Sequence, residues 1–253
     1  MSSQFESSKY QAKEGSNASY LVGTNTNLAP FISGLVGWWP MNEGSGTTAH
    51  DQSGWMNDAV FNVCGTSTLP QWISDGHKTT YGLYFDGLGE YLSATSNNLF
   101  KTGPVSGFTY VGWIKSSSPG HYGENAIIDY YSNVGSHAAF LVDTGSYFIH
   151  ENSPGDTKFF YNLNNIFDNS WHFVAMSYSS NNSANNFFDS TEFSGTANGS
   201  QLQFNSSSGG LWLAGDRGDG CSTYNSMGII SDLRIYNRAL SASEIQALYN
   251  ATK

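Results

Sequence analysis

The chain has 253 residues and a formal net charge of -10, and only 12% of its residues are charged. Binding nucleic-acid phosphates requires clustered cations, so an acidic chain with 10 lysines and arginines is not expected to bind nucleic acid. The many Gly, Ser, Asn, Thr and aromatic residues are typical of a turn-rich β protein, and no apolar run is long enough to span a bilayer.

Residues 1–33 are polar and lack periodicity, which predicts an amino-terminal arm or linker. Such an arm would need its own domain or a neighbouring subunit to lie against. No charged segment followed by an apolar one opens the chain, so export by the usual route is not expected if Met1 is native. The lysine-poor composition nonetheless favours an extracellular, cell-surface or virion location, reached after trimming of a signal or by lysis.

Gly34–Asp58 combines a strand with a loop rich in oxygen donors. Its first half packs apolar residues into one short run, which predicts a strand. Pro40 cannot donate to a sheet ladder, so this strand should lie at an edge or end there. The second half contains turn glycines and several side chains that offer hard oxygen ligands: Asn42, Glu43, Asp51, Asn57 and Asp58.

Short strand-like runs separated by turn residues fill most of the remaining chain. Many short strands without intervening helices predict a β-sandwich or a closed barrel. The expected strands are residues 59–63, two within 81–92, 108–115, 126–131, 138–142, 146–151, 158–161, 171–178, 186–188, 202–204, 211–214 and 229–236.

The chain ends in a predicted helix. Ser241 and Glu244 have the spacing of a capping box, in which each side chain accepts a hydrogen bond from the other residue's main-chain N–H. Leu240 and Ile245 are placed to form a hydrophobic staple across this first turn.

Cys64 and Cys221 are the two cysteines. A disulfide between them would close a long loop and stabilise the fold by about 5 kcal/mol. Two buried thiols are the alternative, because the sequence does not show whether the two positions meet.

Four segments together resemble one known family. They read GLVGWWPMNEGSGTTAHDQSGWMNDAVF, FTYVGWIK, SWHFVAMSY and ISDLRIYNRALSASEIQALY, and they are spread over Gly34–Tyr249. They resemble the laminin-G-like, concanavalin A-like jelly-roll superfamily. The resemblance implies an all-β domain over residues 34–253, an antiparallel two-sheet jelly-roll β-sandwich with a short C-terminal helix and with its first and last strands adjacent.

The resemblance also implies a structural calcium ion, which many members of the family hold. Calcium takes six to eight oxygen ligands, and we expect them to include Glu43, Asp51, Asn57 and Asp232. Asp232 is included because the family topology brings the last strand beside the first. The alternative is that Asp51 and Asn57 cap turns through their own side chains.

Many relatives bind glycans or protein partners, which directs attention to aromatic residues in loops and at strand ends. Sugar rings stack on flat aromatic faces, while Asn and Asp side chains bind hydroxyl groups. Trp55 stands out, because with Met56 it occupies a position where the family usually has small polar residues. The expected ligand-binding residues are Trp55, Trp72, Tyr122, Asn125, Asp129, Tyr130, Tyr131, Asp216 and Tyr224.

Catalysis is not expected. Glycosidases need two cooperating carboxylates, and the related glucanases carry a Glu-x-Asp arrangement that is missing from this chain. Asp86 with Glu90 and Glu124 with Asp129 are looser pairs that suit turns and strand ends. A glycoside hydrolase is therefore the least favoured function.

Two functions remain open at this point. The first is a recognition or adhesion module that binds glycans or a surface partner. The second is a structural subunit or decoration of a virion or extracellular filament that assembles through residues 1–33.

Overall fold

A computed structural model describes residues 29–65, 68–94, 103–104, 106–120, 124–131, 137–143, 148–149, 166–180, 183–196, 203–204, 210–215 and 225–253. The chain divides into two compact units, residues 1–33 and 34–253. The described part of the first unit contains one short helix, α2 (Ala29–Ile32). All the described strands belong to the second unit.

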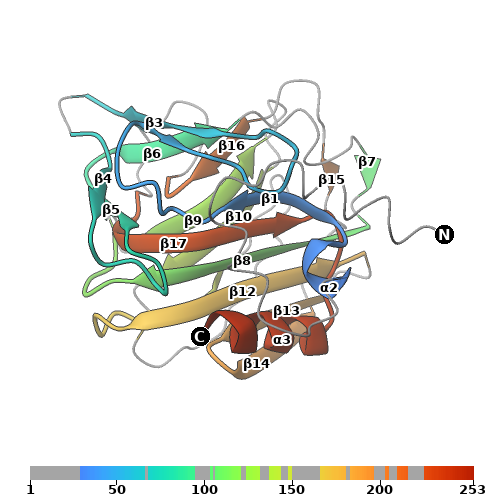
Figure 1. Ribbon diagram of the computed structural model, residues 1–253. Helices are drawn as coiled ribbons and strands as arrows, with labels where there is room; N and C mark the ends of the chain where they lie inside the picture. The colour runs from blue at the N-terminus through green and yellow to red at the C-terminus, as the bar shows by residue number, and fades with distance from the viewer. Residues whose placement is uncertain are drawn as a thin grey trace. The chain divides into compact units, whose positions relative to one another are not determined.

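Two large sheets form the second unit (Figure 1). Sheet A has the strand order β14-β13-β12-β8-β17-β5-β4, and β1 also pairs with β17. Its strands are β1 (Leu35–Trp39), β4 (Gln71–Ile73), β5 (Gly82–Asp86), β8 (Gly107–Lys115), β12 (Trp171–Ser179), β13 (Ser183–Phe188), β14 (Thr191–Thr196) and β17 (Met227–Tyr236).

Sheet B has the order β11-β10-β9-β16-β6-β3-β2. Its strands are β2 (Thr48–Ala49), β3 (Ala59–Val63), β6 (Glu90–Ala94), β9 (Glu124–Tyr131), β10 (His137–Asp143), β11 (Phe148–Ile149) and β16 (Gly210–Leu213), while β7 (Gly103–Pro104) and β15 (Gln203–Phe204) form a separate pair. All these pairings are antiparallel. The structure thus confirms the predicted antiparallel jelly-roll β-sandwich.

One hydrophobic core joins the two sheets. Alternate residues of each strand point into it, as the period of two in a strand requires. Phe85 and Tyr110 of sheet A and Phe140 and Leu213 of sheet B are fully buried there. Burial of a large apolar side chain contributes about 1.5–3 kcal/mol, so these layers dominate the stability of the sandwich.

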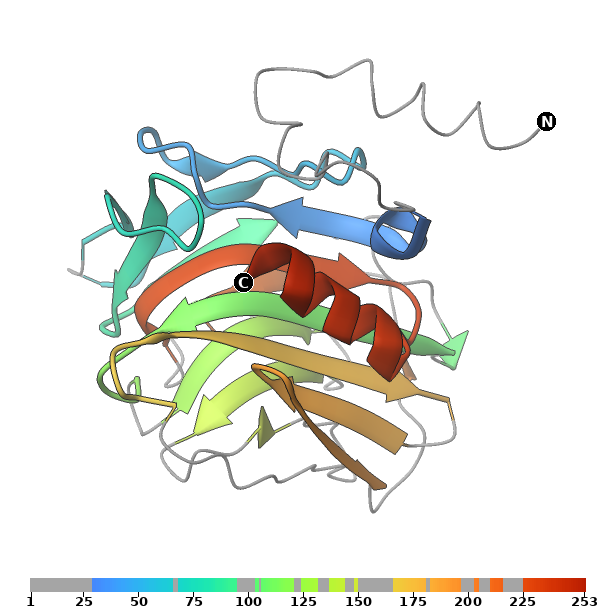
Figure 2. The same cartoon turned by 60° about the horizontal axis from the view of Figure 1, so that its bottom comes forward.

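The C-terminal helix α3 (Ala242–Thr252) lies across sheet A on the face turned away from sheet B (Figure 2). The predicted capping box of Ser241 and Glu244 is present at its start. The ring of Tyr249 stacks on Trp113 with centroids 6.0 Å apart. The indole N–H of Trp113 donates to Thr252 Oγ1 over 3.0 Å, which fixes the last turn of the helix.

Asn186 in β13 is a buried amide inside this apolar core. Its neighbours across the sheet, Met176 and Phe193, belong to the core or pack against it. The side chain of Asn186 is fully buried, and neither its Oδ1 nor its Nδ2 has a hydrogen-bond partner. A buried amide in this state lowers stability.

We therefore expect Asn186→Leu to raise the free energy of unfolding by about 1–3 kcal/mol, the desolvation cost of an unsatisfied polar group. Leucine has nearly the same volume and needs no partner. Urea unfolding of the two proteins measures the difference. A loss of stability of similar size would contradict the expectation, because it would mean that water completes the hydrogen bonds of the amide.

His172, near the start of β12, lies between two carboxylates. Its Nδ1 is 3.0 Å from Asp189 Oδ2, and its Nε2 is 3.0 Å from Asp168 Oδ1. Burial lowers the pKa of His172, but hydrogen bonds and the charges of Asp189 and Asp168 raise it by more. The pKa of His172 therefore lies above its ordinary value of 6.5.

We expect the stability lost in His172→Gln to depend on pH. Because the folded-state pKa is raised, the contribution of His172 is fully present below the unfolded pKa of 6.5 and is lost as the pH rises through the folded pKa. Urea unfolding of both proteins over a pH series measures this. A difference in stability that grows as the pH rises would contradict the assignment.

Candidate functional site

β1 lies at a sheet edge beside the last strand, as both Pro40 and the family resemblance predict. Among the described strands it pairs with β17 alone, with Leu35 opposite Tyr236 and Trp39 opposite Leu233. β17 pairs with β5 along its first half and with β1 along its second half. Its irregular residue Asp232, at φ 52°, lies where the pairing changes.

The loop of residues 50–58 covers the other edge of β1. The Gln52 main-chain N–H donates to the Trp38 carbonyl over 2.7 Å, and Asn57 Nδ2 donates to the Val36 carbonyl over 2.9 Å. In return, the buried indole of Trp39 donates to the Asn57 carbonyl over 2.9 Å. The loop thus supplies hydrogen-bond partners to main-chain groups at the outer edge of β1, which would otherwise be left unpaired at the edge of the sheet.

Asp51 organises this loop with its buried carboxylate. Its Oδ1 accepts hydrogen bonds from the main-chain N–H groups of Trp38 (2.9 Å) and Ser53 (2.8 Å). Its Oδ2 accepts from Ser53 Oγ (2.7 Å) and the Asn57 main-chain N–H (2.9 Å). Both ends of the segment 53–57 are therefore tied to one ionised group, which makes stronger hydrogen bonds than a neutral acceptor.

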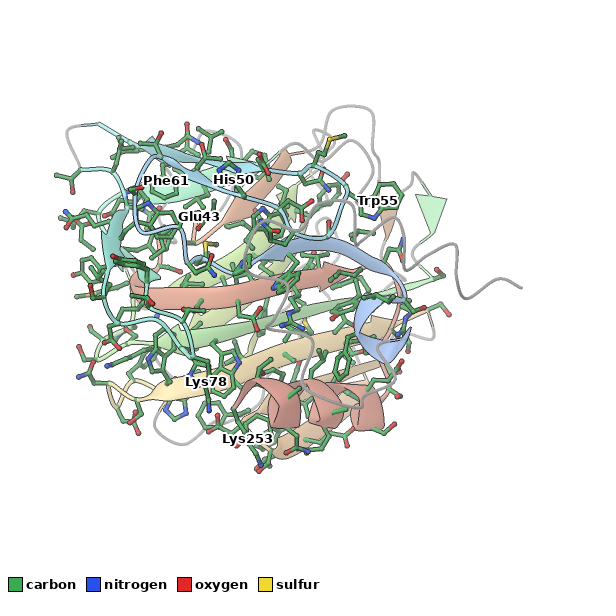
Figure 3. All side chains as sticks on the ribbon, in the orientation of Figure 1. Glu43, His50, Trp55, Phe61, Lys78 and Lys253 are labelled. Carbon is green, nitrogen blue, oxygen red and sulfur yellow. The ribbon has the colours of Figure 1, made fainter. Side chains whose placement is uncertain are left out.

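Trp55 and Met56 form the exposed tip of the loop, which we call the Trp55–Met56 tip (Figure 3 labels Trp55). Trp55 is 44% exposed and Met56 is 71% exposed. Met56 also has a left-handed backbone, at φ 61°, which is unfavourable for a residue with a side chain. The Trp55 indole N–H donates to the Leu35 carbonyl over 3.2 Å, which orients the ring.

Arg234, in β17, pairs with Asp232 of the same strand and lies over the ring of Trp38 in β1. Its guanidinium, which is buried, donates from Nε to Asp232 Oδ1 (3.0 Å) and from Nη2 to Asp232 Oδ2 (2.9 Å). The Trp38 indole N–H donates to the same Oδ1 over 2.6 Å, and the guanidinium carbon lies 5.0 Å from the centroid of the Trp38 ring. Burial lowers the pKa of Arg234, but Asp232 and Tyr236 raise it further, so the group stays charged.

Sequence reasoning missed Arg234. The available signal was its spacing from Asp232, because residues two apart on a strand share a face. An arginine among the alternating apolar residues of ISDLRIY, in a chain with few cations, indicates a paired buried charge.

A second cluster of polar side chains, formed by Glu43, His50 and Asp58, adjoins Asp51. Glu43 Oε1 accepts the His50 main-chain N–H over 2.7 Å, and His50 Nδ1 lies 3.0 Å from Asp58 Oδ2. Asp58 Oδ1 accepts the Asp51 main-chain N–H over 2.8 Å. Figure 3 shows Glu43 and His50 near each other on the β2–β3 side of the sandwich. These contacts extend the loop network to partly exposed side chains.

The four expected calcium ligands do not form one ligand set in this structure. Asp51 accepts main-chain and hydroxyl hydrogen bonds on both oxygens, and Asp232 holds a guanidinium. Glu43 Oε2 is a buried oxygen without a partner, but one oxygen falls far short of a calcium shell. The described residues contain no group of three or more His, Cys, Asp or Glu side chains that could hold a metal ion. Calcium binding by the protein stays a prediction.

Three expected ligand-binding residues are buried in β9. Asn125, Asp129 and Tyr130 are at most 2% exposed, and Asn125 Oδ1 accepts the Met227 main-chain N–H over 2.7 Å. The expectation that they contact a ligand is corrected, because a buried strand presents no surface for stacking. The side chain of Tyr131, and Tyr122, Asp216 and Tyr224 as a whole, lie outside the described residues.

Trp72 in β4 is half-buried. Its ring lies 5.4 Å from that of Phe61, and its indole N–H donates to the Gly46 carbonyl over 3.0 Å. Both contacts fix the ring against neighbouring segments of the domain. Of the expected aromatic residues with a described side chain, Trp55 is the most exposed.

The carboxylate pair of Asp86 and Glu90 belongs to the turn between β5 and β6. Glu90 accepts the main-chain N–H groups of Asp86 (3.0 Å) and Gly87 (3.2 Å) while it is 1% exposed. Burial and the neighbouring Asp86 raise the pKa of Glu90 to about 7. The Glu90 carboxyl group therefore stabilises the turn between β5 and β6 through these hydrogen bonds. The side chain of Glu124, in the other loose pair, lies outside the description.

Cys64 is disulfide-bonded. Cys221, the other cysteine of the sequence, lies outside the described residues. Among the helices that the structure describes, none has the length and apolar character needed to cross a membrane.

Comparisons with solved structures show the same fold in proteins of low sequence identity. Domain 4 of AbnA, an extracellular GH43 arabinanase from Geobacillus stearothermophilus, has a TM-score of 0.63 at 14% identity, over 87% of this chain and 98% of that domain. The receptor binding domain of botulinum neurotoxin D has a TM-score of 0.61 at 16% identity, over 87% of this chain and 53% of the other. A Trypanosoma rangeli sialidase mutant has a TM-score of 0.60 at 16% identity, over 97% of this chain and 38% of the other.

This chain thus spans about two fifths of the sialidase and about half of the neurotoxin chain, but nearly all of the arabinanase domain. A search of curated protein sequences finds no match. The family profile described as the concanavalin A-like lectin/glucanases superfamily (Laminin_G_3) matches residues 74–246, which is more than half of the chain. The chain belongs to the concanavalin A-like lectin/glucanase superfamily.

Proposed function

We propose that this protein is a non-catalytic glycan-binding module whose binding surface is the Trp55–Met56 tip. The observation that carries the proposal is an exposed aromatic ring on a loop whose ends are held by the buried Asp51 carboxylate. An ordered loop loses little conformational entropy on binding, so the contact area of the ring contributes more fully to affinity.

The chemistry of the tip suits a sugar. A pyranose or furanose ring presents C–H groups that pack on a flat aromatic face, and Trp has the largest such face among the side chains. The two ends of the same loop carry His50 and Asp58, whose side chains are 55% and 46% exposed. Figure 3 shows His50 away from Trp55, so these polar groups suit the hydroxyls of an oligosaccharide that extends from the tip along the loop.

The structural relatives support the same class of ligand. The arabinanase domain was solved in complex with arabinotriose, and a botulinum neurotoxin DC binding domain was solved in complex with SialylT. Both share the sandwich but little sequence with this chain, so they support glycan recognition as a class and do not name a sugar.

A glycan array with the folded protein tests the proposal. We expect binding to a limited set of oligosaccharides, and we expect the same hits to weaken in Trp55→Ala. An array without hits, from protein shown to be folded by its unfolding transition, would contradict glycan recognition. Hits of equal strength in Trp55→Ala would contradict the assignment of the tip.

The second function, assembly through residues 1–33, is favoured by one observation. These residues form a compact unit separate from residues 34–253. We propose that they contact a neighbouring subunit in a virion or extracellular filament. Deleting them should leave a folded monomer that no longer assembles, as measured by light scattering, and unchanged assembly would refute the proposal.

A further inference from the structure

We propose that the Asp51 carboxylate, and no bound metal ion, holds the Trp55–Met56 tip in its binding conformation, so that ligand binding there does not require calcium. The inference rests on the proposed function for its ligand. Asp51 is a positioning residue, because its carboxylate contacts the loop and not the ring that would meet the sugar.

The first argument is that the hydrogen bonds of Asp51 fix both sides of the tip. Ser53 precedes the tip and donates twice, from its main-chain N–H and from its hydroxyl. Asn57 follows the tip and donates its main-chain N–H. One carboxylate therefore fixes the distance between the two ends of a short segment, which is how a calcium ion orders a loop through carbonyl and carboxylate ligands.

The second argument is that a cation already occupies the network. Trp38 donates its main-chain N–H to Asp51 and its indole N–H to Asp232, so the same residue contacts both carboxylates. Asp232 is neutralised by the buried guanidinium of Arg234 at 2.9 Å. A calcium ion bound by Asp232 would have to displace that guanidinium or remain beside its positive charge, and both are unfavourable.

Asp51→Asn tests the positioning role. The Ser53 and Asn57 main-chain N–H groups bond to different oxygens of Asp51, and asparagine keeps only one of these acceptors, so at least one of the two amides should lose protection. We expect the hydrogen exchange of the amide that faces the NH₂ group to become about tenfold faster or more, relative to amides of β8 in the same protein. Unchanged exchange at Ser53 and Asn57 would overturn the proposal.

Asp58→Asn is the matched control. It removes the same charge from the same loop, but its main-chain partner, the Asp51 N–H, needs only the one oxygen that asparagine retains. We expect the exchange of the Ser53 and Asn57 amides to stay close to that of the wild type. Equal acceleration in both variants would show that charge alone, and not the Asp51 contacts, orders the tip.

Calcium and EDTA supply the metal arm of the test. With the wild-type protein, we expect the exchange of the Ser53 and Asn57 amides to be the same in excess calcium chloride and in excess EDTA. Slower exchange in calcium, or faster exchange in EDTA, would overturn the claim of metal independence. These measurements use no glycan, so they decide the inference even if the array finds no ligand.

When the array provides a ligand, its affinity is the final readout. We expect Asp51→Asn to bind that oligosaccharide more weakly although Trp55 is intact, and we expect wild-type affinity to be equal in calcium and in EDTA. Wild-type affinity in Asp51→Asn would contradict the positioning role, whereas loss of binding in EDTA would contradict metal independence.

Discussion

Replacing Arg234 with methionine should lower the free energy of unfolding by about 3–5 kcal/mol, the usual effect of leaving one partner of a buried ion pair unpaired. Arg234 is 2% exposed and makes two hydrogen bonds to Asp232. Methionine fills similar volume but leaves the Asp232 carboxylate buried beside the Trp38 ring. Urea unfolding at neutral pH measures the loss.

The double variant Arg234→Met, Asp232→Asn separates lost charge pairing from lost packing. Asparagine carries no charge and still accepts the Trp38 indole N–H, so we expect the double variant to be more stable than Arg234→Met alone. If the stability losses of the single variants Arg234→Met and Asp232→Asn simply add in the double variant, the ion pair is not the source of the effect. That outcome would also contradict a role of this pair in holding Trp38 of β1 against β17.

Trp55→Ala should weaken binding of the array's best oligosaccharide by about 30-fold, which corresponds to about 2 kcal/mol for an aromatic hot spot. The stability of the fold should change little, because Trp55 is 44% exposed and its indole N–H donates to the Leu35 carbonyl over a long 3.2 Å. Isothermal titration measures the affinity, and thermal unfolding checks the fold.

Leu88→Ala is a matched control for this experiment. Leu88 is another large exposed side chain, 68% exposed, in the turn between β5 and β6. Its removal takes away a similar apolar surface at a different place, so we expect affinity to be unchanged. A comparable loss in Leu88→Ala would indicate non-specific hydrophobic binding and contradict a site at Trp55.

Most of the fold followed from the sequence because strand alternation and turn residues are local signals. The run 59–63 coincides with β3, and the expected strands 108–115 and 171–178 differ from β8 and β12 by one residue at one end. β4 and β14, the two end strands in the order of sheet A, were missed, because β4 has only three residues, too few to show alternation, and β14 is mostly polar. The strand expected at 158–161 lies outside the described residues.

The candidate site was predictable only in part. The loop that carries Trp55, and the pairing of the strand before it with the last strand, were anticipated, because turn chemistry and family order are visible in the sequence. Turn capping by Asp51 was the stated alternative to calcium binding, and the sequence could not decide between them, since an oxygen that binds a metal and an oxygen that binds an N–H look the same in a sequence. The pairing of Asp232 with Arg234 was not anticipated. Tyr130 was misassigned because both faces of β9 are buried, which depends on the packing of distant segments.

The most direct test of the central claim follows the indole N–H signals of the seven tryptophans by NMR while the array's oligosaccharide is added. The Trp55 signal is assigned with Trp55→Phe, and the fully buried Trp39 is the internal control. We predict that the Trp55 signal shifts in proportion to occupancy while the Trp39 signal stays in place. Saturable binding that leaves the Trp55 signal unmoved would contradict a glycan site at the Trp55–Met56 tip.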